Sequence, residues 1–197
     1  MAPVLETARL RLRQWHGRDL APFAALNADP RVMAWLPRPL SRAESAAMAA
    51  RCRRLIAVQG WGFWAVETRA EGAFLGLVGL HRCGAELPFA PAVEIGWRLA
   101  RHAWGQGYAG EAARAALGFG FTRLGLDEIV AFTSLHNQRS LALMARLGMR
   151  ADPQPFEHPA LPPGHRLRAH WLCRLARADW RDTAASDPAR DHRGGIG

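Results

Sequence analysis

Alternating apolar and polar positions along the chain predict a series of short strands. The clearest case is 93–99, where Val93, Ile95, Trp97 and Leu99 alternate with polar or small residues. Two apolar runs flank the polar stretch 68–72, which predicts an antiparallel hairpin. A fully apolar run at 129–133 predicts a central strand. The strands predicted in this way are residues 10–15, 61–67, 74–81, 93–99, 129–133 and 166–175.

Helical periodicity and terminal signals predict the helices between these strands. Asp19 is placed to cap a first short helix. Ser41 and Glu44 match a capping box, and Gly60 is a stop signal for the same helix. Ala113, Leu117, Phe121 and Leu124 form an apolar stripe on a later helix, beside a track of small residues at Ala116 and Gly120. The predicted helices are residues 20–26, 32–36, 42–58, about 110–124 and 140–147.

This order of elements predicts a mixed α/β fold in one domain. We expect that domain to span residues 8–177 and to include a proline-rich surface loop at 152–164. Residues 178–197 are rich in Asp, Arg and Gly, and we expect a disordered tail there. No apolar run approaches the roughly 20 residues that span a bilayer, and no signal peptide is evident at the N-terminus.

Cysteine content and charge narrow the function classes. Three distant cysteines match neither a disulfide framework nor a zinc-ligand spacing, so we expect a cytoplasmic protein without a metal. The net charge is +9, and all 26 basic residues are arginine. The absence of lysine excludes a Walker A nucleotide hydrolase and Schiff-base chemistry. Because the composition is generally rich in Ala, Arg, Gly and Pro, we do not take the charge as a sign of nucleic-acid binding.

A glycine-rich turn, Trp104-Gly105-Gln106-Gly107-Tyr108-Ala109, separates the strand 93–99 from the next helix. Glycine lets the backbone approach a ligand without a Cβ clash. The N-terminus of a helix presents free N–H groups and a positive dipole end, which suit an anion such as a diphosphate. An ordinary strand-to-helix turn would use glycine in the same way, so the turn alone leaves both interpretations open.

The turn and the strand before it resemble the acetyl-CoA-binding motif of the GNAT N-acetyltransferases, in particular the branch that includes ribosomal-protein N-terminal acetyltransferases. The family's loop, (Gln/Arg)-x-x-Gly-x-(Gly/Ala), falls on residues 104–109, with Trp104 at the first position. The resemblance covers roughly residues 8–177. It implies a mixed, mostly antiparallel twisted sheet of about seven strands, splayed between the fourth and fifth, with helices on both faces.

The resemblance also implies roles for individual residues. Glu94 would be the general base, although it could equally be a solvated or Arg-paired strand residue. Asn137 would contact the pantetheine, a role compatible with capping the next helix. The family's usual tyrosine acid falls on Met144, so Ser140 becomes the candidate acid, against an ordinary first-turn serine. Tyr108 suits packing better than chemistry, and the histidines at 158, 165 and 170 do not have zinc spacing.

The predicted function is therefore acetyl-CoA-dependent N-acetylation of a primary amine, on a protein N-terminus or a small molecule, in a ternary complex. The alternative is a non-catalytic acyl-CoA-binding or regulatory protein of the same fold. We expect acetyl-CoA and an amine as partners, no nucleic acid or membrane, and a monomer or homodimer. The candidate catalytic residues are Glu94 and Ser140. The candidate acetyl-CoA contacts are Ile95, Gly96, Trp97, Trp104, Gly105, Gln106, Gly107, Tyr108, Ala109, Gly110, Asn137 and Ser140.

Overall fold

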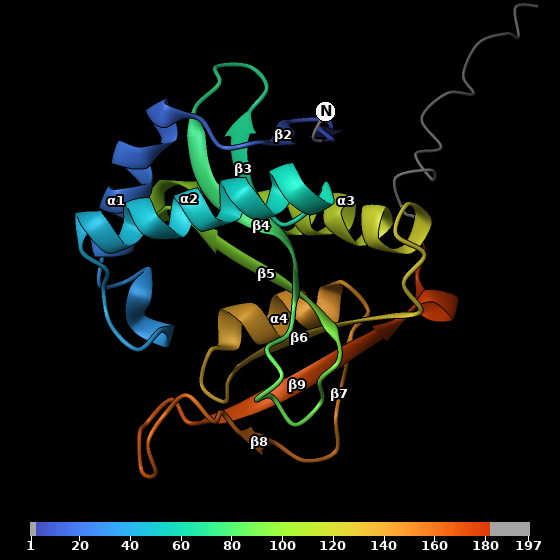
Figure 1. Cartoon of the computed structure of the whole chain (residues 1–197). Helices are drawn as coiled ribbons and strands as arrows, with labels where there is room; N and C mark the ends of the chain where they lie inside the picture. Colours follow the sequence, from blue (N-terminus) through green and yellow to red (C-terminus); the bar gives the residue numbers. More distant parts are fainter. Residues whose placement is uncertain (1–2, 182–197) are drawn as a thin grey trace, which may run out of the picture.

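A computed structural model describes residues 3–181, which form one mixed sheet with helices on both faces (Figure 1). The strand order is β1-β2-β3-β4-β5-β6-β9-β7, and β8 also pairs with β9. Every pairing is antiparallel except β5 with β6, which confirms the predicted mixed, mostly antiparallel sheet. The strands are β1 Leu5–Glu6, β2 Leu10–Arg13, β3 Phe63–Thr68, β4 Phe74–Arg82, β5 Val93–Leu99, β6 Glu128–Ser134, β7 Arg150–Ala151, β8 Phe156–Glu157 and β9 Ala169–Ala176.

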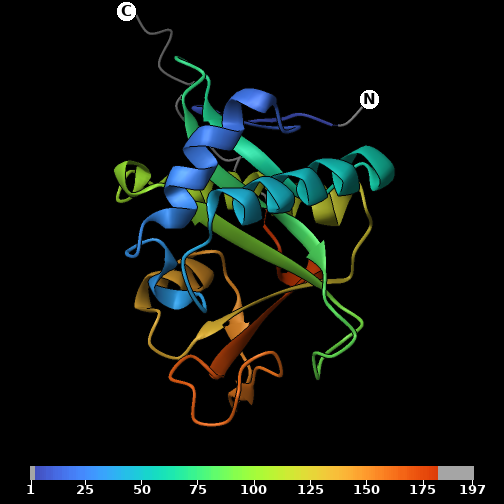
Figure 2. The ribbon, with the colours of Figure 1, turned by 60° about the vertical axis from the view of Figure 1, so that its left-hand side comes forward.

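The helices α1 and α2 lie on one face of the sheet and α3 lies on the other (Figures 1 and 2). The predicted capping box at the start of α2 is present, because Ser41 Oγ accepts from the Glu44 N–H and Glu44 accepts from the Ser41 N–H. The α-helices are α1 Leu20–Ala28, α2 Arg42–Gln59, α3 Tyr108–Thr122 and α4 Gln138–Arg146. The short 3₁₀ turns are η1 Gly17–Asp19, η2 Met33–Trp35, η3 Arg101–Ala103 and η4 Arg177–Asp179.

The sheet is weakest between β5 and β6, the fourth and fifth of the predicted strands. Their single paired position is Glu94 with Val130, whereas β4 and β5 pair along seven positions. Beyond Glu94, β5 diverges from β6, as Figure 1 shows. The sheet thus splays at the place that the family resemblance implied.

Close packing of α3 fixes its position relative to this splay. Ala113, Leu117 and Phe121 are buried, as the predicted stripe requires. Gly120 lies so near the sheet that a Cβ there would meet Ile129 Cδ1 at 2.6 Å. A larger residue there would require the Ile129 side chain to shift. The helix thus packs closely on β4, β5 and β6.

Three predictions about local structure need correction. Asp19 stands at the N-cap position of α1 but makes no cap hydrogen bond, because its carboxylate binds Arg13 instead. The proline-rich stretch includes the short strand β8, which pairs with β9. The last strand begins at Ala169, later than the predicted 166.

The ordered chain also continues past residue 177. The residues from Arg177 to Asp179 form η4, and the Trp180 ring packs 5.7 Å from that of Phe121. The rest of the predicted tail, 182–197, lies outside the described residues.

Candidate functional site

The glycine-rich turn ends in a row of free backbone donors at the start of α3. Gly105 and Gly107 adopt φ of 76° and 79°, a left-handed conformation that favours glycine. Within the described chain, none of the N–H groups from residue 105 to 110 donates to a protein acceptor. The first backbone bond of the helix is Glu111 N–H to the Gly107 carbonyl, at 3.1 Å. The turn can therefore offer six consecutive N–H groups to an anion.

Side chains around the turn hold it in place. Trp104 Nε1 donates to the Leu99 carbonyl at 2.9 Å, which ties the turn to the end of β5. Arg9, just before β2, donates to the Gln106 carbonyl at 3.0 Å and lies over the Tyr108 ring. Tyr108 thus packs against the Arg9 guanidinium. Arg9 itself was missed by sequence reasoning, because it lies about a hundred residues away from the turn.

The charge near the turn is favourable for an anion. Arg114 Nη1 lies 3.5 Å from where a Cβ on Gly110 would stand, and the Arg139 guanidinium lies 4.4 Å from the Trp104 ring centre. The one carboxylate in the first turn of α3, Glu111, is bound to Arg9 and Thr7. Burial would raise the pKa of Glu111, but the hydrogen bonds from Thr7 and Arg9 lower it below its usual range. The negative charge of Glu111 is therefore balanced by Thr7 and Arg9.

A polar network connects β5 with the start of α4. Trp97 Nε1 donates to Ser140 Oγ at 3.3 Å, and Asn137 Nδ2 also donates to Ser140 Oγ at 3.1 Å. Asn137 caps α4 through its Oδ1, which accepts from the Ser140 N–H, and its Nδ2 reaches Thr133 Oγ1 at 2.9 Å. The predicted cap is confirmed, and three candidate residues from two elements meet where β5 and β6 diverge.

Glu94 lies on the opposite face of β5 from this network. Its Oε1 is 3.6 Å from His81 Nδ1, on the neighbouring strand, and the side chain is 21% exposed. His81 stacks on the Phe63 ring, and its Nε2 is 3.5 Å from Arg51 on α2. The carboxylate therefore has a titratable partner and access to solvent, which a proton acceptor needs. His81 was not among the predicted residues.

Strand alternation explains which predicted residues share a face. Ile95 and Trp97 point toward α3 and α4, whereas Glu94 and Gly96 point toward α1 and α2, where Phe63 approaches the position of a Gly96 Cβ at 3.0 Å. Glu94 and Ser140, the candidate base and acid, consequently lie on opposite sides of the splay. A reacting group held between β5 and β6 would be reached from both sides.

Aromatic and histidine side chains gather beside β6, on the strands that follow the splay. The rings of His158 and His170 are 5.0 Å apart, and both contact Phe132. Burial lowers the pKa of both histidines. Ser134 Oγ, at the end of β6, is buried without a hydrogen-bond partner in the described structure. These side chains form a cluster beside β6 that was not predicted from the sequence.

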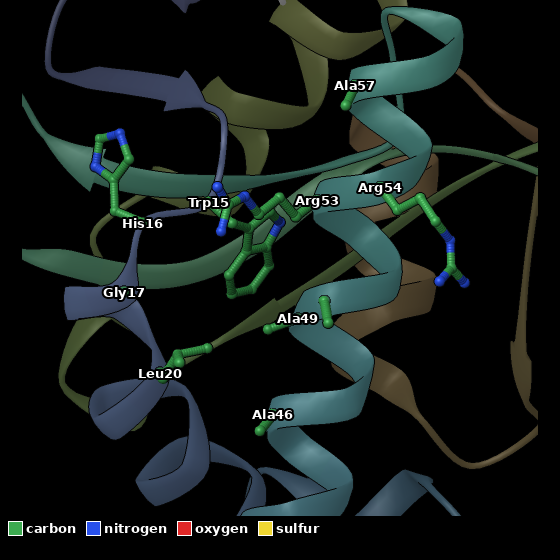
Figure 3. Close-up of a pocket in the computed structure, with 10 residues that line it drawn as sticks. Trp15, His16, Gly17, Leu20, Ala46, Ala49, Arg53, Arg54 and Ala57 are labelled. Carbon is green, nitrogen blue, oxygen red and sulfur yellow. The ribbon is translucent and has the colours of Figure 1, made fainter.

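Two cavities lie on the α1 and α2 side of the molecule. One of about 310 Å³ lies between α2 and the beginning of α1, where Trp15, Leu20 and Ala49 face one another (Figure 3). None of the predicted site residues lines it. The other, of about 260 Å³, is lined by Met33, Leu36, Pro37, Arg38, Leu40 and Arg98. Of the helices in residues 3–181, none has the length and apolarity to cross a membrane.

Comparison with known proteins agrees with this geometry. Residues 9–150 match the family model described as an acetyltransferase (GNAT) domain. The chain is 32% identical over 146 residues to the uncharacterized protein YkkB of Bacillus subtilis, covering 74% of this chain and 84% of that protein. It is 31% identical over 186 residues to an FsC-acetyl coenzyme A-N(2)-transacetylase of Aspergillus fumigatus, covering 90% of this chain and 78% of that protein.

Solved structures share the fold. A GNAT-family acetyltransferase from Bacillus anthracis superimposes with a TM-score of 0.75 at 22% identity, covering 89% of this chain and 99% of that one. RimL, a ribosomal L7/L12 α-N-protein acetyltransferase solved with coenzyme A, superimposes with a TM-score of 0.70 at 16% identity, covering 88% and 98%. The GNAT fold that the resemblance implied is thus confirmed.

Proposed function

The chain belongs to the GNAT acetyltransferase family, and from this premise we propose that it is a cytoplasmic N-acetyltransferase that uses acetyl-CoA. The acceptor would be a primary amine, on a small molecule or a protein N-terminus. The observation that carries the proposal is the run of six free N–H groups from 105 to 110, placed beside the splay of β5 and β6. A diphosphate needs such donors, and an extended acyl chain needs such a gap.

The residues around the splay have the donors and charges that acetyl-CoA would need. The amides of residues 105–110 would hold its diphosphate, with the guanidinium groups of Arg114 and Arg139 near enough to add positive charge. The amide-bearing arm would lie along β5 beyond Glu94, where β6 provides no partner. Asn137 and Ser140 would face it from α4.

Glu94 suits the task of taking a proton from the acceptor amine. Its carboxylate is partly exposed and paired with His81, so a proton could pass to it directly or through water. The free amine would then form a C–N bond at the thioester carbonyl carbon, and the C–S bond would break. Backbone N–H groups near 95–97 would polarise the carbonyl oxygen. Ser140, on the other side of the splay, would give a proton to the departing thiolate and would regain one, through water, from the second proton that the acylated nitrogen loses.

The cysteines favour this direct transfer over an acyl-enzyme. Burial, together with the nearby carboxylates of Glu94 and Glu86, raises the pKa of Cys83 to about 12. Burial also raises the pKa of Cys52 to about 11 and that of Cys173 above its usual value. Because the thiolate is the nucleophilic form, all three cysteines are poor nucleophiles near neutral pH.

Calorimetric titration with coenzyme A tests the binding half of the proposal. Wild type should bind, and Gly107→Val should weaken binding at least tenfold, because valine disfavours φ of 79° and crowds the free amides. Gly17→Val, at an open site in η1, is the control and should bind like wild type. Equal affinity in all three proteins would remove the turn from the binding site.

Thiol release from acetyl-CoA tests the catalytic half. With an amine acceptor that wild type uses, Glu94→Gln should lower kcat severalfold while coenzyme A affinity stays unchanged. Met144, which occupies the position of the family's tyrosine acid, is buried in the core and cannot donate a proton. This observation supports the alternative, a non-catalytic acyl-CoA-binding protein. Binding of acetyl-CoA without thiol release for any amine would favour that alternative.

A further inference from the structure

Arg98 is a half-buried cation without a carboxylate partner in the described residues. It lies at the end of β5, and its Nη1 donates to Asn27 Oδ1 at 2.7 Å and contacts Met48 Sδ at 3.7 Å. Within residues 3–181, no carboxylate oxygen lies within 4.0 Å of the guanidinium nitrogens, and Nε and Nη2 have no protein partner. Burial lowers the pKa of Arg98 to about 10. A charge that is largely removed from water is normally paired with an opposite charge. The guanidinium of Arg98 can therefore accept an anionic partner from outside the chain.

The cavity beside Arg98 gives that partner a place. It measures about 260 Å³ and is otherwise lined by apolar side chains and Arg38. Arg38 is already bound to Glu44, through two hydrogen bonds. The cavity wall at η2 is tied to the loop before β9 by a hydrogen bond from Arg166 to the Ala34 carbonyl, at 2.9 Å. Arg98 is therefore the unpaired cation of a formed, mostly apolar cavity.

Arg98 also stands on the correct face of β5 for the acceptor. Side chains two residues apart on a strand share a face, so Arg98, Gly96 and Glu94 all point toward α1 and α2. Two residues along a strand span about 7 Å. A small acceptor could hold an anionic end at Arg98 while its amine reaches the strand near Gly96 and Glu94.

We propose that Arg98 binds a carboxylate of the acceptor, so that the substrates are amines that also carry a carboxylate a few bonds from the nitrogen. This inference rests on the proposed function and names the substrate class of the same site. Arginine presents a planar fork of donors that matches a carboxylate, and the Nε and Nη2 of Arg98 are free to form it. The apolar residues that line the cavity would strengthen this ion pair by reducing its contact with water.

Kinetics with matched acceptors test the proposal. The first pair is 4-aminobutyrate and 4-aminobutyramide, and the second is the α-amides of glutamic acid and glutamine. In each pair only the carboxylate differs. Wild type should use the carboxylate member of at least one pair with kcat/KM at least tenfold higher. The first pair tests recognition of a terminal carboxylate, and the second pair tests recognition of a side-chain carboxylate. Arg98→Met should remove the preference mainly through KM, Arg98→Lys should restore part of it, and Arg42→Met, an exposed arginine outside the cavity, should keep it.

Calorimetry keeps this test separate from the test of catalysis. With coenzyme A bound, 4-aminobutyrate or glutamic acid α-amide should bind wild type at least tenfold tighter than Arg98→Met, whether or not turnover occurs. Equal affinity of the two proteins for both ligands would overturn the inference. Thiol release with equal kcat/KM for both members of each pair would also overturn it, while leaving the N-acetyltransferase proposal intact.

Discussion

Arg13 on β2 and Arg98 on β5 both extend beneath the helices on one face of the sheet, but their surroundings differ. Arg13 is 4% exposed and donates to two carboxylates, Asp19 at 2.7 Å and Glu67 at 2.5 Å. Arg98 donates to one neutral amide and borders a cavity. Burial would lower the pKa of Arg13, but its bonds to Asp19 and Glu67 raise it above its ordinary value. The pKa of Arg98 moves in the opposite direction because no carboxylate opposes burial.

This contrast distinguishes a charge that holds the fold from a charge that is available to a ligand. The Arg13 cluster joins β2, η1 and β3 and leaves its guanidinium saturated. Removing one member of such a cluster strands the other charges in the interior. No carboxylate relies on Arg98 for charge balance, so the cost of desolvating its guanidinium is not offset by an ion pair within the fold. Arg13 therefore stabilises the fold, whereas Arg98 is the residue proposed for recognition, and three measurements test this difference.

The largest expected difference is in folding stability. Arg13→Met should lower the free energy of unfolding by about 3–5 kcal/mol, because Asp19 is left buried without its cation and Glu67 keeps only the more exposed Arg11 and Arg18. Arg98→Met should change it by no more than about 1 kcal/mol, since one hydrogen bond to Asn27 is lost while a charge penalty disappears. Chemical denaturation of the two variants measures both values. A loss of several kcal/mol in Arg98→Met would erase the contrast.

A second measurement uses a variant in which Arg98 gains a carboxylate partner, as Arg13 already has. Asn27→Asp keeps the shape of the side chain and places a carboxylate against Arg98, at the position of the present 2.7 Å contact. The guanidinium then has an internal partner, and carboxylate-bearing acceptors should bind about tenfold more weakly, a loss of about 1.4 kcal/mol. Calorimetry with 4-aminobutyrate reads out the change. The control is Asn27→Gln, which introduces no charge, and an equal loss there would indicate altered shape instead.

The smallest expected effect is in acid stability. The pKa of Asp19 and of Glu67 is raised by burial but lowered more by Arg13, so both folded-state values lie below the unfolded ones. Their contribution is present above the unfolded pKa values of about 4 and is lost as pH falls through the folded values. Between pH 5 and 2, Arg98→Met should lose stability as steeply as wild type. Asp19→Asn should lose about 1 kcal/mol less over that range. Parallel acid profiles for wild type and Asp19→Asn would contradict the assignment.

Local signals in the sequence predicted most of the fold. The capping box at Ser41, the alternation in 93–99 and the cap at Asn137 depend on residues close together in the chain, and all three form as expected. Asp19 shows the limit of such signals. Its spacing suits a cap, but a buried arginine on a strand competes for the same carboxylate and binds it instead. Local spacing alone does not reveal that competitor.

The candidate site was predicted where a continuous motif carries it and missed where it is assembled from distant segments. The turn 104–109 keeps its glycines and free amides within one stretch of chain. Glu94 was predicted from the strand motif, but its partner His81 becomes adjacent only through the register of β4 and β5. Arg98 was one of 26 arginines, and nothing in the sequence distinguished it. Its distinction is the lack of a carboxylate around it, which only the packing of α1 and α2 reveals.

The single paired position between β5 and β6 has a mechanical consequence. The sheet has two parts, the strands β1 to β5 and the strands β6 to β9. Within residues 3–181 they are paired at one position, Glu94 with Val130. Little backbone pairing therefore joins the two parts of the sheet, and α3 and α4 contact each other on one face of it. A molecule bound between β5 and β6 would connect the two parts of the sheet.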